Sequence, residues 1–275
     1  MSMKIAVCVK SVPDVEYQDK VIIDPVTKTF DRSAIPSAIN SADKHALELA
    51  FSIRENYGGE ITAVSMGPVG AKEQLYEALA MGADRGVLLS DEKLAGADTL
   101  ATSYALSVLL KNLDDFDLVL AGNESDDGGT AHVPIQLGEW LEIAHVIHVT
   151  KVDVEDGKNL TVHKEVEGGT GIYKCSTPCL IAVKKKINTV RYTTVEGVMS
   201  AKNKPLIEWC VDDLKGIDEK YIGYKGSPTK SGDLRIVDRT RKSQALVGSA
   251  DEIARRILDK INRLTNTKWG VKYEK

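Results

Sequence analysis

The chain has 275 residues, with 36 basic and 40 acidic side chains, a net charge of −4 at pH 7 and an isoelectric point near 5.8. It is long enough for one large α/β domain, or for a domain with an arm, and it lacks the basic surplus of nucleic-acid-binding proteins. No apolar run approaches the length of a membrane span. We therefore expect a small ligand or a protein as the binding partner, no nucleic acid and no membrane insertion.

The amino terminus and the cysteines indicate a reducing compartment. The apolar stretch 5–9 is followed by a lysine and is too short for the core of a signal peptide. The four cysteines have the spacing of neither a disulfide framework nor paired metal-ligand knuckles. They are Cys8, Cys175, Cys179 and Cys210. We expect a soluble, cytoplasmic protein.

Strands and helices alternate through the first half of the chain. Continuous apolar runs predict buried parallel strands at residues 5–9, 61–66, 86–89 and 118–121. Caps and apolar faces predict helices that begin at Asn40 or Ser41, near Ala71, at Asp98 and at Thr130, with Gly58 and Gly82 ending the first two. Residues 21–30 are typical of a small hairpin. The alternation predicts a mainly parallel, doubly wound α/β sheet.

A different pattern follows residue 143. Strand-like runs at residues 146–154, 160–167, 172–175 and 180–184, separated by turns, predict antiparallel additions. The polar, turn-rich residues after Leu214 predict an extended arm, and Ser249 is expected to cap a final amphipathic helix. Because such a helix cannot bury its apolar face alone, a partner subunit or the main domain must receive it. The expected divisions are 1–213, 214–248 and 249–275.

The stretch from Asp117 to Leu141 joins a strand, a turn-rich loop and a helix. Free backbone N–H groups and the positive end of the helix dipole converge at such a helix start, which favours phosphate binding. Gly128 and Gly129 would let the backbone approach a ligand, although the glycines could equally serve only to turn the chain. Ligands bind beyond the carboxyl ends of parallel strands, so the loops at Lys10, Gly67 and Gly122 are expected along one rim.

Signatures of several enzyme classes are absent from the sequence, namely the P-loop, His-Glu-x-x-His and the Gly-x-Ser-x-Gly elbow. Asp126 and Asp127 lack a second group placed to form an acid–base pair, so ribose recognition or turn stabilisation is expected of them. His132 could touch a phosphate or ribose, or be a surface residue. Cys175 and Cys179 are explained more simply as small core residues than as a metal or redox pair. We predict no catalytic residue and no metal ligand.

Segments spread over the whole chain share one pattern. They are Val9–Asp14, Asn40–Ala50, Ala63–Pro68, Ala78–Gly86, Asp127–Ala131 and Arg191–Lys202. Together these segments resemble the β subunit of electron-transfer flavoproteins. The chain departs from that family's pattern at His132, where Gln is usual, at Gly129, where a carboxylate or amide is common, and at Gly171 and Tyr173.

The resemblance implies a sheet of the adenine-nucleotide-binding type and a heterodimer with an α subunit that carries FAD. The β subunit would act only within an oxidoreductase complex, as an electron carrier, and would contribute a nucleotide site. That site holds structural AMP in some members. In bifurcating members it holds a second FAD, reduced by NADH, which splits electrons between a high-potential path and ferredoxin or flavodoxin. The matching positions are Cys8, Asn40, Ser41, Ala42, Asp43, Met66, Gly122, Asn123, Ser125, Asp126, Asp127, Gly128, Gly129, Thr130 and His132.

The segment 191–204 resembles the family's recognition segment for acyl-CoA dehydrogenases or related oxidoreductases. Its expected contact residues are Tyr192, Val195, Met199 and Lys202, with Val195 as the apolar anchor. Small residues at Gly128 and Gly129 leave room for a pyrophosphate and an isoalloxazine, which favours FAD over AMP. The alternatives from other classes are an adenylyl-transfer enzyme, a nucleotide-sensing stress protein and an assembly subunit with an empty site.

Overall fold

The structure is a computed structural model that describes residues 2–14, 17, 22–23, 30–31, 35–230, 232 and 243–265. The chain divides into two compact units, Met1–Leu234 and Arg235–Lys275. The first unit contains the sheet and its helices, and the second contains helix α7 (Ala250–Thr265). All the residues expected at the nucleotide and recognition sites therefore belong to the first unit.

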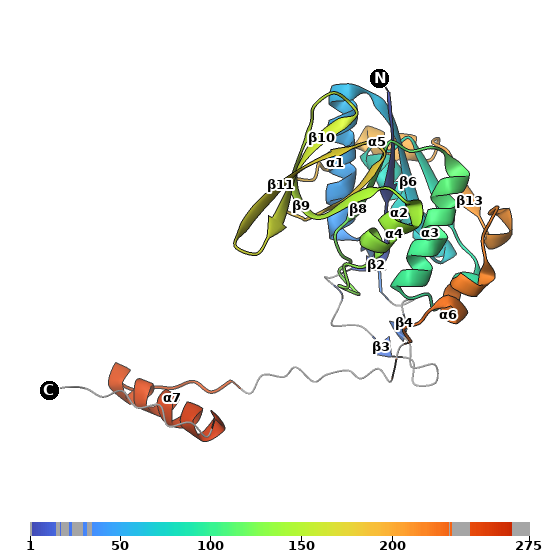
Figure 1. Cartoon of the computed structure of the whole chain (residues 1–275). Helices are drawn as coiled ribbons and strands as arrows, with labels where there is room; N and C mark the ends of the chain where they lie inside the picture. Colours follow the sequence, from blue (N-terminus) through green and yellow to red (C-terminus); the bar gives the residue numbers. More distant parts are fainter. Residues whose placement is uncertain are drawn as a thin grey trace. The chain divides into compact units, whose positions relative to one another are not determined.

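A large sheet forms the centre of the first unit (Figure 1). In the described part of the chain it has nine strands in the order β11-β10-β9-β12-β8-β1-β6-β7-β13. The strands from β9 to β13 in this order are mutually parallel, whereas β10 runs antiparallel to β9 and β11. Their bounds are β1 Met3–Cys8, β6 Gly59–Met66, β7 Arg85–Leu89, β8 Leu118–Gly122, β9 Ala144–Val154, β10 Asn159–Val166, β11 Gly169–Ser176, β12 Cys179–Val183 and β13 Leu206–Trp209.

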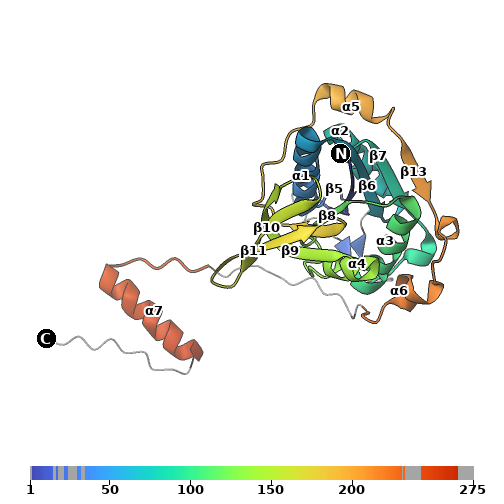
Figure 2. The same cartoon turned by 45° about the horizontal axis from the view of Figure 1, so that its top comes forward.

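Helices cover both faces of the sheet (Figure 2). Helices α1 and α2 lie on one face with α5 outside α2, and α3 and α4 lie on the other. Their bounds are α1 Ser41–Tyr57, α2 Lys72–Met81, α3 Thr99–Leu113, α4 Val133–Leu141, α5 Val195–Ala201 and α6 Gly223–Gly226. Two short strand pairs, β2 Ser11–Pro13 with β5 Ser37–Ile39 and β3 Ile22–Ile23 with β4 Phe30–Asp31, complete the described strands. This arrangement confirms the predicted doubly wound α/β fold.

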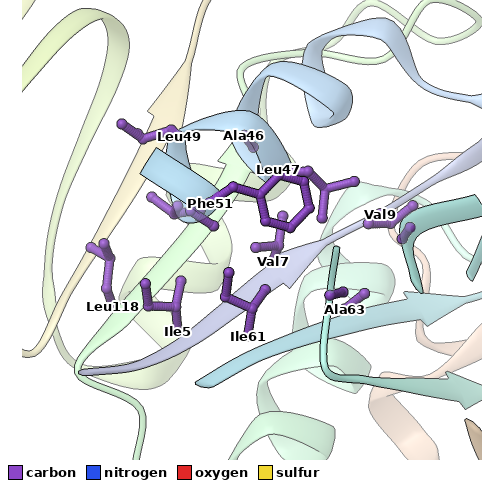
Figure 3. Close-up of a cluster of buried hydrophobic side chains, with 14 of the residues drawn as sticks. Ile5, Val7, Val9, Ala46, Leu47, Leu49, Phe51, Ile61, Ala63 and Leu118 are labelled. Carbon is purple, nitrogen blue, oxygen red and sulfur yellow. The ribbon is translucent and has the colours of Figure 1, made fainter. Parts of the chain in front are cut away.

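The core on the α1 side is built around a single aromatic residue. Phe51 projects from α1 towards Ile5 and Ile61 of the neighbouring strands β1 and β6 (Figure 3). All three side chains are fully buried. Burial of a side chain of this size contributes about 2–3 kcal/mol. The packing fixes α1 against the sheet and so determines where the first residues of α1 lie.

Several local predictions are confirmed by the structure. The Asp98 carboxylate accepts hydrogen bonds from the N–H groups of Leu100 and Ala101, as an N-cap does. Gly58 and Gly82 follow the last residues of α1 and α2 with φ of 73° and 138°. The hairpin expected at residues 21–30 appears as the antiparallel pair of β3 and β4, and its turn lies outside the described residues.

The direction predicted for residues 180–184 was wrong. Strand β12 is parallel to both of its neighbours, β8 and β9, rather than part of an antiparallel series. All of its five residues are buried, as is typical of a strand covered on both faces of a parallel sheet. The N-cap predicted at Thr130 was also wrong, because α4 begins at Val133 after His132 and places Pro134 in its first turn.

Residues after Leu214 pack on the first unit and do not form an arm there. Leu214 and Ile222 are buried, and the Asp218 N–H donates to the Tyr104 hydroxyl of α3 at 2.8 Å. The aromatic rings of Tyr104 and Tyr221 lie 5.3 Å apart. This part of the expected arm is therefore tied to α3 by apolar and polar contacts, whereas residue 231 and residues 233–242 lie outside the described part.

The final helix begins where the sequence predicts. The Ser249 hydroxyl accepts a hydrogen bond from the Glu252 N–H at 3.4 Å, and the Glu252 carboxylate accepts one from the Ser249 N–H at 3.0 Å. These reciprocal bonds form a capping box. Helix α7 contains no buried residue within its unit, so its apolar side chains lack an internal core.

Candidate functional site

Three parallel strands end at one rim of the sheet. Strand β1 pairs with β6 on one side and β8 on the other, so Cys8, Met66 and Gly122 come to the same edge. Helix α1 starts at this edge, because the Asn40 N–H donates to the Lys10 carbonyl at 2.9 Å. The structure thus brings together the loops that the sequence predicted along one rim.

Asp43 is the buried centre of this rim. Its carboxylate accepts hydrogen bonds from the backbone N–H groups of Lys10 and Gly122, at 2.8 and 3.0 Å, and from the Asn40 side-chain amide at 3.0 Å. Burial raises the pKa of Asp43 to about 7, against the lowering effect of these hydrogen bonds. A Cβ atom at Gly122 would lie 2.3 Å from the Asp43 carboxylate, so only glycine fits there. The loop after β1, the end of β8 and the start of α1 are thus joined through one side chain.

Cys8 lies beside this carboxylate. Burial and the charge of Asp43 raise the pKa of the Cys8 thiol to about 12. The thiol therefore stays protonated at neutral pH and is a poor nucleophile. Of the expected site atoms at Cys8, the backbone is the part suited to contact a ligand.

Asn40 and Asp126 connect the loop after β8 to the start of α1. The Asn40 amide group donates to the Glu124 carbonyl at 3.0 Å, and its oxygen accepts from the Asp126 N–H at 2.9 Å. The Asp126 carboxylate accepts from the Ser41 N–H at 3.0 Å, from the Ser41 hydroxyl, and from the Lys185 ammonium at 2.6 Å. Burial works to raise the pKa of Asp126, but the bonds from Lys185 and Ser41 outweigh it and hold the pKa below its usual value. Asn40 occupies the N-cap position but uses its side chain to hold the loop.

The N–H groups of the two loop glycines form hydrogen bonds within the turn itself. The Gly128 N–H donates to the Asp127 carboxylate at 2.7 Å, and the Gly129 N–H donates to the Ser125 carbonyl at 2.9 Å. The Lys10 ammonium joins Asp127 at 2.6 Å. Among the described residues, the Thr130 N–H has no backbone partner. In this conformation the free donors at the loop are therefore found towards the start of α4, beyond the two glycines.

A cavity of about 310 Å³ lies behind the loop, lined in part by Ala42, Asn123 and Val183. Asn123 is buried, and its side-chain oxygen accepts from the His148 N–H at 2.9 Å. Its amide nitrogen has no hydrogen-bond partner among the described residues. The lining also contains Glu124, Glu165 and three lysines, and Glu165 accepts from Lys184 and Lys186 at 2.6 Å. A buried unpaired donor beside a cavity of mixed charge fits a polar ligand. His132 is exposed at the position before α4.

A second surface lies on α5, which the sequence did not predict as a helix. Tyr192, Val195 and Met199 are 96%, 79% and 73% exposed, and Val198 and Lys202 are exposed beside them. Arg191 precedes these residues in the sequence, and its guanidinium group binds the Glu48 carboxylate of α1 at 2.8 Å. We call the apolar side chains Tyr192, Val195, Val198 and Met199 the docking face. Exposed apolar side chains held in a fixed position are typical of a protein-binding surface.

Neither a metal centre nor a membrane span is found among the described residues. Among them, no group of three His, Cys, Asp or Glu side chains is placed to hold a metal ion. No described helix is long and apolar enough to cross a membrane. A second cavity of about 340 Å³, lined in part by Asn56, Lys151 and Asn188, lies between α1 and β9 and holds none of the residues expected at the rim.

Comparison with known proteins identifies the family. Residues 27–214 match the electron transfer flavoprotein domain. The chain is 45% identical over 252 residues to the electron transfer flavoprotein subunit beta of Clostridium acetobutylicum, with 88% of this chain and 95% of that protein covered. The chain belongs to the electron transfer flavoprotein family, as a β subunit. The corresponding subunit of Thermoanaerobacterium thermosaccharolyticum is 41% identical over 260 residues, with 94% and 98% covered.

A further relative is named as part of a larger complex. The caffeyl-CoA reductase-Etf complex subunit CarD of Acetobacterium woodii is 42% identical over 229 residues, with 83% of this chain and 86% of that protein covered. Electron transfer flavoprotein β subunits pair with an α subunit, and the family binds flavin-related cofactors. Because the chain belongs to this family, the two alternative hypotheses of an adenylyl-transfer enzyme and a nucleotide-sensing stress protein are wrong.

Proposed function

We propose that this electron transfer flavoprotein β subunit binds FAD at the rim and works in flavin-based electron bifurcation. The observation that carries the proposal is the contrast between the two sides of the loop after β8. Asp43, Asn40 and Asp126 hold the loop from behind, whereas a Cβ atom at Gly129 would meet nothing within 4 Å. A rigid loop with an open outer side suits a ligand larger than a mononucleotide.

The residues of the rim have distinct tasks in this proposal. The Thr130 N–H would donate to phosphate oxygens. The Lys10 and Lys185 ammonium groups, which pair with Asp127 and Asp126, would turn part of their charge to the phosphates. Asp126 and Asp127 offer acceptors for ribose hydroxyls. When bound, FAD would accept electrons from NADH and pass them on, while the protein orients it and adjusts its potential.

The other partners follow from the same proposal. An oxidoreductase such as an acyl-CoA dehydrogenase would bind the docking face, and ferredoxin or flavodoxin would take the low-potential electrons. The name of the Acetobacterium woodii relative, which places that protein in a reductase–Etf complex, supports an oxidoreductase partner. The chain itself would act only as a carrier within such a complex.

The alternative is a non-bifurcating β subunit with structural AMP at the same rim. The test is to purify the chain with its α subunit, release the bound nucleotides by denaturation and quantify them by chromatography. Two FAD per heterodimer, with flavin bleaching on addition of NADH, are expected. If the heterodimer contains one FAD and one AMP, the proposal is wrong and the non-bifurcating alternative holds. If it contains no second nucleotide, the chain is an assembly subunit with an empty site.

A further inference from the structure

Two cysteines that the proposed function does not use lie side by side at the other end of the sheet. Cys175 is near the end of β11, and Cys179 is the first residue of β12. Their Sγ atoms are 4.0 Å apart. A disulfide needs an S–S distance of about 2.05 Å, so closing the gap requires a movement of about 2 Å. Strand β11 is at the edge of the sheet and has a partner strand on one side alone among the described strands, where Cys175 lies opposite Leu160 of β10. The adjustment therefore falls on this edge strand and on the two cysteine side chains.

The two thiols differ in access and in acidity. Cys175 is half-buried, whereas Cys179 is 1% exposed and belongs to the core on the α1 side. The hydrogen bond with Cys179 lowers the pKa of the Cys175 thiol, and the same contact together with burial raises the pKa of Cys179. The half-buried thiol is thus the more acidic of the two. An accessible thiolate with a second thiol beside it is the arrangement in which oxidation ends in a disulfide.

We propose that Cys175 and Cys179 form a modification site at which a peroxide oxidises Cys175 and Cys179 then closes a disulfide with it. The Cys175 thiolate attacks one peroxide oxygen, the O–O bond breaks, and the departing hydroxide takes up a proton to give water. The Cys179 sulfur then loses its proton and attacks the sulfur of the Cys175 sulfenic acid, which releases a second water. Two thiols and one hydrogen peroxide become one disulfide and two waters, with two electrons passing from sulfur to oxygen.

The sequence around the pair allows a direct test. Trypsin cleaves after Lys174 and after Lys184, so both cysteines fall in the single peptide 175–184. The complex with the α subunit would be purified without oxygen, treated with hydrogen peroxide, denatured in acid, alkylated with iodoacetamide and digested. We expect this peptide to lose both labels and to weigh two hydrogen atoms less than the unlabelled reduced peptide. Reduction with dithiothreitol before alkylation should restore both labels.

Single substitutions distinguish the roles of the two cysteines in the oxidation. In Cys179→Ser, Cys175 should proceed to the sulfinic or sulfonic acid, and in Cys175→Ser, Cys179 should keep its label. Cys210 is the internal control, because it is half-buried and its thiol contacts the Asp213 carboxylate at 3.2 Å rather than a second cysteine. If the peptide 175–184 keeps both labels at a peroxide dose that oxidises Cys210, or if wild-type Cys175 ends as a sulfinic acid without a disulfide, the proposal is overturned.

Discussion

At the scale of single residues, Asp43 decides the geometry of the rim. Its carboxylate is the common acceptor for donors from the loop after β1, the loop after β8 and the Asn40 side chain. In Asp43→Ala the Lys10 and Gly122 N–H groups lose their acceptor, while the Asn40 amide keeps its bond to the Glu124 carbonyl. Because each unsatisfied buried donor costs about 1–3 kcal/mol and the loops can relax, we expect a loss of about 3 kcal/mol in the free energy of unfolding.

Urea unfolding of the chain measures this loss, and nucleotide content of the heterodimer measures the effect on the site. The matched control is Asp212→Asn, whose carboxylate is exposed and pairs with Lys93 on the surface. That change should stay within about 0.5 kcal/mol of wild type. If Asp43→Ala unfolds no more easily than this control, Asp43 does not hold the loops together.

The raised pKa of Asp43 also predicts how stability depends on pH. The pKa is about 7 in the folded chain against 3.8 for an ordinary aspartate, so between these values the folded chain keeps a proton that the unfolded chain releases. The contribution of Asp43 to the free energy of unfolding therefore falls as pH rises from about 4 to about 7, by roughly 1.4 kcal/mol per pH unit at most. Groups with lowered pKa values, such as Asp126, act in the opposite direction.

Comparison with Asp43→Asn isolates this contribution, because asparagine does not titrate. We expect the stability of wild type relative to this variant to decrease between pH 5 and pH 7, as measured by urea unfolding at each pH. A difference that stays constant across this window would mean that Asp43 is already ionised at pH 5.

At the scale of elements, α5 is held rigidly while its outer side stays free. A Cβ atom at Gly197 would lie 2.3 Å from the Ala80 carbonyl, so the helix packs directly on the backbone of α2. The Thr194 hydroxyl accepts the Gly197 N–H at 3.0 Å, and Lys204 donates to the carbonyls of Leu79 and Ala83 at 2.8 Å. A fixed helix loses little entropy when a partner binds to it.

Val195 is the residue that tests this surface. Because an exposed apolar anchor contributes mainly to partner binding, Val195→Gln should slow electron transfer to the oxidoreductase that we propose as partner about tenfold, equivalent to about 1.4 kcal/mol. Flavin content and unfolding should remain as in wild type. Val69→Gln is the control, since Val69 is also exposed but lies in the turn before α2. If the two variants transfer electrons at equal rates, Val195 does not contribute to partner binding.

Some elements could be predicted from the sequence and others could not, for physical reasons. The strands β1, β6, β7 and β8 are continuous apolar runs, and that pattern reports burial on both faces. The direction of β12 depends on which strands it joins, and periodicity carries no information about neighbours. Helix α5 has seven residues and exposes its apolar side chains, so it lacks the amphipathic pattern of a buried helix.

The position of the site could be predicted from the sequence, but the contacts of its side chains could not. The rim itself followed from strand order, because loops after parallel strands meet at one edge. The central role of Asp43 and the use of the Gly128 and Gly129 N–H groups inside the turn did not follow, because both depend on contacts between segments far apart in the sequence. An aspartate in the first turn of a predicted helix is the one local signal that the sequence contains.

At the scale of the whole molecule, the chain consists of a complete α/β unit and a helix without a core of its own. Every described contact that fixes the rim comes from within the first unit. In α7, Ile257, Ile261 and Leu264 are exposed at intervals that place them on one side. Since the β subunit pairs with an α subunit, we infer that this apolar side packs on the α subunit and strengthens the heterodimer.

The double variant Ile257→Gln and Ile261→Gln tests the role of α7 in assembly. Loss of two aliphatic side chains that the proposed interface would bury should weaken association with the α subunit by about 2–4 kcal/mol, a rise of roughly thirtyfold to a thousandfold in Kd. The measurement is sedimentation or titration of the variant against the purified α subunit. Arg255→Gln, on the charged side of the same helix, is the control and should bind as wild type does. Because the first unit contains all the residues that hold the rim, the double variant should fold normally, and undiminished binding to the α subunit would show that α7 packs elsewhere.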